Sequence, residues 1–243
     1  MNGALAIALL ALASCRTEAA PAPPSEAPKA DKAKPKKEPP VAKRIAPIKA
    51  ALCVTTGIAS VGTKIEKPSM RAVAKGTDGE AASMTFTFGG ETATTKKLAS
   101  GDLRRQLGLK LRAENGCNLI YVMWRLDPKP MINAQVKRNP GAKDHKACGT
   151  NGYAWIKATE DKAPPALVVG DKHTLRAEIE NDELSVYIDD TRYWRGAIPE
   201  SARDLRGPAG IRSDNLAFDL HSFDAAASNV DVGNAKCVSE DHD

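Results

Sequence analysis

The sequence lacks an apolar run of the ~20 residues that a membrane-spanning helix needs. Near its start, residues 4–13 are apolar and uncharged, which is the length of the hydrophobic region of a signal peptide. No Lys or Arg precedes this segment, and that leaves an upstream start codon open. We therefore expect residues 1–14 to be an export signal and not a transmembrane helix.

Motifs of the common catalytic sites are also missing. The sequence contains no Gly-x-Ser-x-Gly nucleophile motif and no Gly-rich phosphate loop. The nearest approach to a glycosidase carboxylate pair is Glu178 and Glu180. These residues directly precede a turn, so a position on the solvent-exposed face of a hairpin is a better explanation for them than a catalytic pair. We name no catalytic residue and expect no cofactor.

The basic character of the chain lies in one segment. The whole chain has 35 Lys and Arg against 30 Asp and Glu. Residues 16–50 hold this surplus, together with eight of the sixteen prolines and no aromatic residue. Such a composition predicts a disordered linker with polyproline character. Residues 51–243 are balanced in charge, so we expect a folded domain there that does not bind nucleic acid.

The five cysteines support export. The string LASC that ends at Cys15 resembles the lipobox of bacterial lipoproteins. The resemblance implies cleavage before Cys15 and lipidation of its thiol, so residues 15–50 would be a lipidated linker. The alternative is a plain signal peptide with an incidental cysteine. An even number of remaining cysteines favours disulfides in an oxidising compartment. Of the three possible pairings, we expect Cys53–Cys237 and Cys117–Cys148.

Zinc binding is the rival interpretation of these cysteines. A zinc site requires closely spaced Cys and His residues, and the sequence offers only the pair His145 and Cys148. We therefore expect no metal.

Beyond residue 51, the hydrophobic pattern has a period of two, which is typical of β-strands. Residues 117–126 are apolar nearly throughout, as a strand buried on both faces would be. The pair Asn181 and Asp182 predicts a hairpin turn between two alternating segments. One helix is expected, at residues 199–205. The fold class is therefore all-β, a two-sheet antiparallel sandwich of the jelly-roll type.

Residues 173–223 carry a family resemblance. The string HTLRAEIENDELSVYIDD, an aromatic strand and the string GPAGIRSDNLAFDL follow one another. This order resembles the C-terminal half of concanavalin A-like jelly rolls, as in laminin-G-like and 3-keto-disaccharide hydrolase-type domains. The resemblance implies a β-sandwich. It implies no single function, because the fold occurs in lectins, glycanases and plain interaction modules.

Aromatic residues next to polar ones give the candidate binding site, because sugar rings stack on exposed Trp and Tyr side chains while polar groups fix their orientation. A disulfide between Cys117 and Cys148 would bring two such groups to one surface. The alternative is that these aromatic residues pack in the core. The expected ligand-binding residues are Trp124, Arg125, Arg138, Asn151, Tyr153 and Trp155.

We expect the domain to bind carbohydrate or another envelope component without catalysis. A carbohydrate-active hydrolase and a purely structural lipoprotein are the alternatives. Arg16 follows Cys15, where an Asp commonly marks inner-membrane retention. By resemblance to other Gram-negative lipoproteins, this favours a lipid anchor in the outer membrane.

Overall fold

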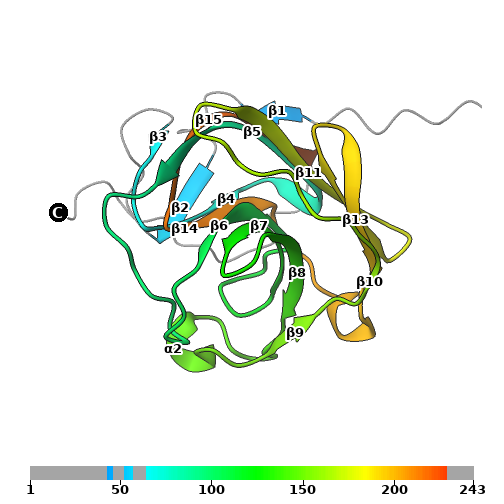
Figure 1. Ribbon diagram of the computed structural model, residues 1–243. Coiled ribbons are helices and arrows are strands. Elements are labelled where there is room, and N and C mark those ends of the chain that lie inside the picture. The colour runs from blue at the N-terminus through cyan, green and yellow to red at the C-terminus, as the bar shows by residue number, and fades with distance from the viewer. Residues whose placement is uncertain (1–42, 46–51, 57–63, 229–243) are drawn as a thin grey trace, which may run out of the picture. The chain divides into compact units, whose positions relative to one another are not determined.

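The computed structural model describes residues 43–45, 52–56 and 64–228, and nearly all of its regular structure is antiparallel β-strand. Figure 1 shows strands arranged in two layers that enclose the core. The two-sheet antiparallel sandwich expected from the alternating pattern is confirmed. Within the described ranges, no helix is long and apolar enough to cross a membrane.

The first sheet has eight strands. They are β1 (Lys43–Ile45), β3 (Lys64–Ile65), β5 (Thr77–Glu91), β10 (Ala158–Asp161), β11 (Lys172–Glu180), β12 (Glu183–Ile188), β13 (Thr191–Ala197) and β15 (Leu216–Ala227). Seven of them follow the order β1-β15-β5-β11-β12-β13-β10, and β3 pairs with β15. The predicted hairpin is present, since Asn181 and Asp182 link β11 to β12 with φ angles of 50° and 61°.

The second sheet has seven strands in the order β2-β4-β14-β6-β7-β8-β9. They are β2 (Leu52–Thr56), β4 (Ser69–Ala74), β6 (Arg105–Leu111), β7 (Leu119–Asp127), β8 (Met131–Lys137), β9 (Tyr153–Trp155) and β14 (Gly210–Asp214). The C-terminal strand β14 lies between β4 and β6. Segments far apart in the sequence therefore present their side chains on one continuous surface.

The core lies between the sheets, and β7 is buried on both of its faces as predicted. One face of β7, which includes Trp124, joins the main core together with three leucines of β6. The other face joins a smaller apolar cluster on the outside of the sheet, made of Cys53, Val73, Ala113, Leu119, Tyr121 and Met123. The outer side of the seven-stranded sheet is therefore partly covered, and it is here that a cavity forms.

Three local features differ from expectation. The helix expected at residues 199–205 is only a 3-10 turn, η1 (Glu200–Ala202), which buries Ala202 and ends before the buried Leu205. A short helix not expected from the sequence, α2 (His145–Cys148), follows β8. Strand β1 falls within the range expected as linker and pairs with β15.

The disulfide Cys117–Cys148 is confirmed, with sulfurs 2.09 Å apart. Because Cys148 is bonded to Cys117, it is not a zinc ligand. The second expected pair, Cys53–Cys237, remains a prediction because residue 237 is outside the described residues. The same holds for Cys15 and for the export signal.

Candidate functional site: a cationic cavity on the seven-stranded sheet

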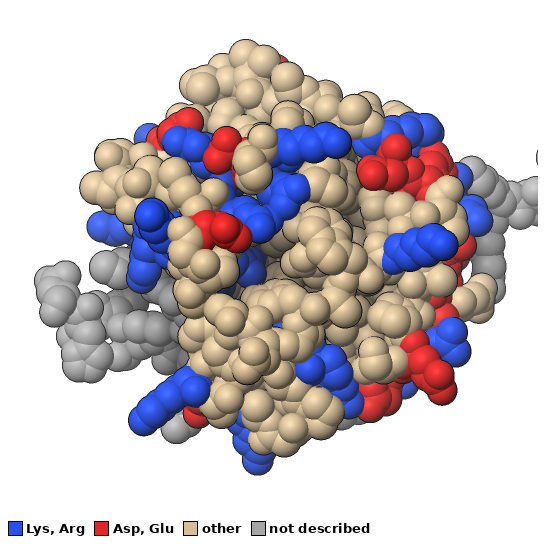
Figure 2. Space-filling model, turned by 60° about the horizontal axis from the view of Figure 1, so that its bottom comes forward, with Lys and Arg blue, Asp and Glu red and all other residues tan. Residues whose placement is uncertain are grey.

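A cavity of about 670 Å³ opens on the outer face of the seven-stranded sheet. Strands β4, β6, β7, β8, β9 and β14 contribute to it. The loops at residues 96–98, 113–116 and 143–144 and the first residue of α2, His145, complete its walls. Its size is within the roughly 300–1,000 Å³ of ligand-binding pockets. Figure 2 shows Lys and Arg side chains gathered around a hollow on this side of the molecule.

Strand alternation decides which side chains reach the cavity. Lys110 of β6 lies between leucines that face the core, so it points outward. The cross-strand register places it opposite Tyr121 of β7 and Gly210 of β14. Arg212 of β14 is opposite Gly108 in the same way. A Cβ at either glycine would lie 2.1–2.2 Å from a backbone oxygen of the adjacent strand, so these positions require glycine.

One buried carboxylate organises the arginines of the cavity. Asp214 accepts from Arg71 at 2.7 Å, from Arg212 at 2.9 Å and from Gln106 at 2.7 Å. Burial alone would raise the pKa of Asp214, but Arg212 and Arg71 hold it below its usual value of 3.8. The Arg212 guanidinium also lies 4.7 Å from the centroid of the Tyr121 ring. Asp214 is therefore ionised and engaged on both of its oxygens.

Lys110 is a buried cation without a carboxylate partner in the described structure. Its side chain lines the cavity although the residue is only 5% exposed. Its Nζ donates one long hydrogen bond, 3.3 Å, to the carbonyl oxygen of Ala72. Burial, together with the charges of Arg71 and Arg212, lowers the pKa of Lys110 from 10.5 to about 7.

Lys137 is a second buried cation in the cavity. Its Nζ donates to the carbonyl oxygens of Gly149 at 2.9 Å and Gly116 at 3.3 Å, and it lies 5.0 Å from the centroid of the Tyr153 ring. Burial, Arg212 and Arg71 lower the pKa of Lys137. Lys137 thus joins two wall segments and adds positive charge to the floor.

Aromatic rings adjoin these cations. The rings of Tyr121 and Tyr153 are stacked, with centroids 6.2 Å apart and planes 19° from parallel. Trp155 follows Tyr153 on the same face of β9 and is 56% exposed, and the Arg125 guanidinium lies 6.0 Å from its ring centroid. Burial raises the pKa of the Tyr153 phenol. The site therefore combines cations at its floor with accessible ring faces at its edge.

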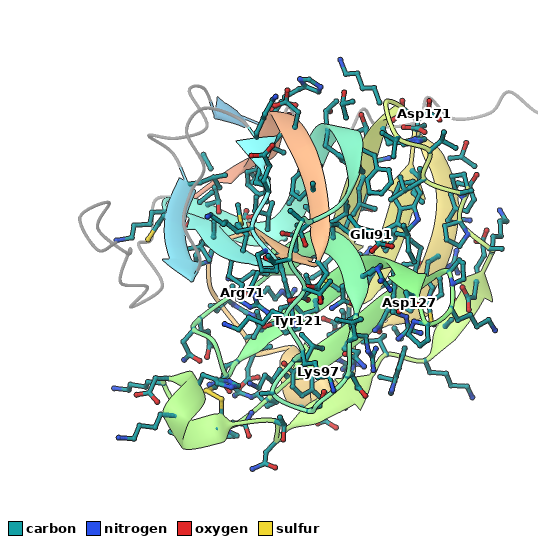
Figure 3. The ribbon with its side chains drawn as sticks, turned by 60° about the vertical axis from the view of Figure 1, so that its left-hand side comes forward. Arg71, Glu91, Lys97, Tyr121, Asp127 and Asp171 are labelled. Atoms are coloured by element: carbon teal, nitrogen blue, oxygen red, sulfur yellow. A yellow bond between two sulfur atoms is a disulfide. The ribbon has the colours of Figure 1, made fainter. Side chains whose placement is uncertain are left out.

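The walls are fixed by specific contacts. Asn215, which adopts a φ of 57°, holds the loop before β6 because it accepts from the Lys96 amide at 2.7 Å and donates to the Lys96 carbonyl at 3.0 Å. The opposite wall is held by the disulfide between Cys117 and Cys148. Figure 3 shows Arg71, Tyr121 and Lys97 in one region, reached from β4, β7 and this loop.

The structure brings together only some of the predicted site residues. Tyr153 lines the cavity, and Trp155 and Arg125 lie close to each other on the same sheet. The proposal of Trp124 as a ligand contact is corrected, because its ring is 1% exposed and packs against Phe86 and His173 in the core. The Cys117–Cys148 disulfide therefore does not bring Trp124 and Trp155 to a shared surface.

Arg138 and Asn151 do not line the cavity. Arg138 pairs with Asp204 at 2.6 Å and with Glu114 at 3.6 Å, and it holds the loop after η1. Asn151 is exposed, and its carbonyl oxygen accepts from the Asn139 side chain at 3.0 Å. Both residues act in the described structure as parts of loop packing.

Sequence reasoning missed most of the floor. These floor residues come from four strands, β4, β6, β7 and β14, whose adjacency depends on the order of the sheet; they are Arg71, Lys110, Tyr121, Arg212 and Asp214. The available signal was a charged residue between apolar ones, as at Lys110 between two leucines, and this is also the ordinary pattern of a solvent-exposed strand face.

The chain matches no protein-family model and no curated protein. Among solved structures, it is similar to the carbohydrate-binding module CBM66 from Bacillus subtilis, with 13% identity over 73% of this chain and 94% of that chain and a TM-score of 0.46. It is also similar to a tetrameric galectin from the sponge Cinachyrella sp., with 12% identity over 65% of this chain and 99% of that chain and a TM-score of 0.41. A third similar structure is galectin-Ib from Xenopus laevis, with 12% identity over 64% of this chain and 97% of that chain and a TM-score of 0.42.

Proposed function

We propose that the domain is a non-catalytic carbohydrate-binding module whose binding site is the cavity on the seven-stranded sheet with its adjoining aromatic rings. The observation that carries this proposal is the combination of accessible ring faces and hydrogen-bond donors in one place. Tyr153 is 41% exposed beside the cavity, and Trp155 continues this surface along β9. Aromatic faces bind the apolar faces of sugar rings, and convergent polar groups select their orientation.

The carboxylates of the cavity favour binding over hydrolysis. A glycosidase needs two carboxyl groups that can exchange protons with the substrate and water. Only two aspartates line the cavity in the described structure. Asp214 is held by two arginines, and Asp144 accepts from the Ala147 amide at 2.9 Å as the N-cap of α2. Asp214 is buried and engaged on both oxygens, so Asp144 is the only accessible carboxylate among the described lining residues, and one carboxylate does not make the pair that a glycosidase requires.

Other carboxylates belong to separate regions. Figure 3 shows Glu91 and Asp127 at a distance from Tyr121, and both are paired with Arg105, at 2.8 and 3.2 Å. Glu178, which the sequence offered as part of a pair, is bound by Arg176 on the eight-stranded sheet. These ion pairs support a structural role for the three residues.

The module is further proposed to be tethered in the cell envelope through a lipid on Cys15, with the outer membrane as the favoured site. The lipobox-like string and the Pro- and Lys-rich segment that follows it support this part of the proposal. Membrane fractionation of cells that express the full chain tests it. We expect the chain in the membrane fraction and Cys15→Ala in the soluble envelope fraction; equal partitioning of the two would reject the anchor.

Binding is tested with the full chain, purified in detergent, against a panel of neutral and acidic polysaccharides in affinity gels. Trp155→Ala should weaken binding about ten-fold, because stacking of one ring contributes ~1–2 kcal/mol. Tyr187→Ala on the eight-stranded sheet serves as the control and should bind like the parent chain. An absence of binding to every polymer would reject the carbohydrate function.

A further inference from the structure

We propose that the glycan recognised by this cavity is acidic, and that a carboxylate or sulfate ester of a sugar residue is bound by Lys110, Lys137 and Arg212 on the floor. The inference rests on the proposed function and specifies its ligand class. Its basis is the placement of charge inside the cavity, which differs from that of the rest of the domain.

The positive charge is local. Seven Lys and Arg residues line the cavity, against two aspartates. Residues 51–243 as a whole carry equal numbers of the two signs. An overall basic domain would attract anions to any part of its surface, whereas this one concentrates cations at a single concave site. Such concentration raises the local positive potential and selects ligands of opposite charge.

Two of the three floor cations, Lys110 and Lys137, lack a carboxylate partner within the described structure, whereas Arg212 is paired with Asp214. Among these residues, the ammonium groups of Lys110 and Lys137 donate only to backbone carbonyl oxygens. Both residues are at most 5% exposed, and burying a charge is costly unless an opposite charge accompanies it. The single floor carboxylate, Asp214, is already shared by two arginines. An incoming anion would supply the missing partner and would form charge-assisted hydrogen bonds in a site of low dielectric constant.

The depth of the cations favours a glycan over a nucleic acid. Nucleic-acid sites present mobile Lys and Arg side chains along an exposed track that follows the phosphates. Here three of the cations lie at the bottom of a hollow, where only a group that enters the cavity can reach them. A carboxylate on a sugar ring can enter while the ring lies against Tyr153. The exposed rim residues Lys96, Lys97 and Lys143 would then contact the acidic groups of neighbouring sugars.

The test compares matched polymers with the full chain in detergent at pH 6.5, in affinity gels. Polygalacturonate is compared with the same polymer after reduction of its carboxyl groups, and chondroitin sulfate with desulfated chondroitin. We expect at least ten-fold tighter binding to polygalacturonate, chondroitin sulfate or both than to the matched partner, and weaker binding as NaCl is raised. Tighter binding in one pair alone identifies the anion as carboxylate or sulfate.

Equal binding within both pairs would overturn the inference and leave the carbohydrate function intact, whereas no binding to any polymer would reject both. Binding to single-stranded DNA as tight as to the acidic glycans would also overturn it, because the site would then recognise phosphate chains without regard to sugar.

Variants locate the site. Lys110→Met should reduce binding of the acidic polymer about ten-fold or more. Lys172→Met, an exposed lysine on the eight-stranded sheet, is the matched control and should bind as the parent does. The rim double variant Lys96→Ala/Lys97→Ala leaves the buried floor untouched and should reduce binding about three-fold or more, with a smaller dependence on salt. Unchanged binding in both cavity variants would overturn the inference.

Discussion

Replacement of Lys110 by methionine removes a buried positive charge and keeps an unbranched side chain of similar length. The ammonium group of Lys110 lies beside Arg71 and Arg212 and has one long hydrogen bond, to Ala72. In the absence of ligand, this buried charge lowers the free energy of unfolding of the domain. We therefore expect Lys110→Met to bind acidic glycan poorly and to be more stable than the parent chain.

The magnitude follows from the pKa of Lys110, which falls from 10.5 to about 7 on folding. One pKa unit corresponds to ~1.4 kcal/mol, so protonated Lys110 lowers the free energy of unfolding by roughly 5 kcal/mol. The variant loses a hydrogen bond worth about 1 kcal/mol, and local relaxation reduces the gain further. We expect a net increase of about 2–4 kcal/mol, which lies within the ~1–4 kcal/mol gained when buried ion pairs are replaced by apolar side chains.

The pH dependence has a defined sign. Below pH 7, Lys110 is protonated in both the folded and the unfolded chain, so its destabilising effect is complete. Between about pH 7 and 10.5, the folded chain releases the proton and the unfolded chain keeps it. The parent chain is therefore stabilised relative to the variant by ~1.4 kcal/mol for each pH unit. The other groups that face Lys110, which are Arg71, Tyr121, Lys137, Arg212 and Asp214, are present in both chains.

Urea unfolding followed by circular dichroism measures this difference at pH 6.5, 8 and 9.5. The gap between Lys110→Met and the parent should be largest at pH 6.5 and should narrow at each higher pH. Lys172→Met should stay within about 0.5 kcal/mol of the parent throughout. A variant that is no more stable than the parent at pH 6.5, or a gap that does not narrow, would show that Lys110 is not a destabilising buried cation.

Three other predictions use the same unfolding assay. Removal of the disulfide in Cys117→Ala/Cys148→Ala should lower the free energy of unfolding by about 3 kcal/mol, because it closes a loop with a sequence separation of 31; an unchanged midpoint would contradict this. Trp124→Ala should cost about 3–5 kcal/mol as a core truncation, whereas Trp155→Ala should change stability by less than about 0.5 kcal/mol; similar losses in both would contradict the assigned burial. Asp214→Asn should cost about 3–5 kcal/mol at neutral pH because two arginines lose their carboxylate. Since the pKa of Asp214 is lowered, its contribution is complete above about pH 4 and is lost as the pH falls further, so the variant should show a shallower acid limb.

The strands could be predicted from the sequence because their pattern is local. The alternation on β11 and β12 and the turn at Asn181 and Asp182 fix a hairpin whose parts are adjacent in the chain. The continuous apolar run of β7 likewise indicated burial on both faces. Residues 199–205 were expected to form a helix and form only the 3-10 turn η1. So short a connection buries only Ala202 and Leu205, which is too little apolar surface to stabilise a longer helix.

The binding cavity could not be predicted in the same way, because it is a property of strand order. Lys110 and Arg212 lie on adjacent strands because β14 pairs with β6. The paired residues are about one hundred positions apart in the sequence. The balanced charge of residues 51–243 also hid the site, since a net charge averages over all faces of the domain. Trp124 was misplaced for a related reason. Alternation on β7 shows that neighbouring side chains face opposite ways, but it does not show which of two apolar faces is the core.

The most direct test of an acidic-glycan site on this sheet is a crystal structure of the protein with a bound galacturonate oligosaccharide. We expect a carboxylate within hydrogen-bond distance of Lys110, Lys137 or Arg212, with a sugar ring against Tyr153. An oligosaccharide bound on the eight-stranded sheet, or one that lies in the cavity with its carboxylates directed to solvent, would show that the floor cations do not form an acidic-glycan site.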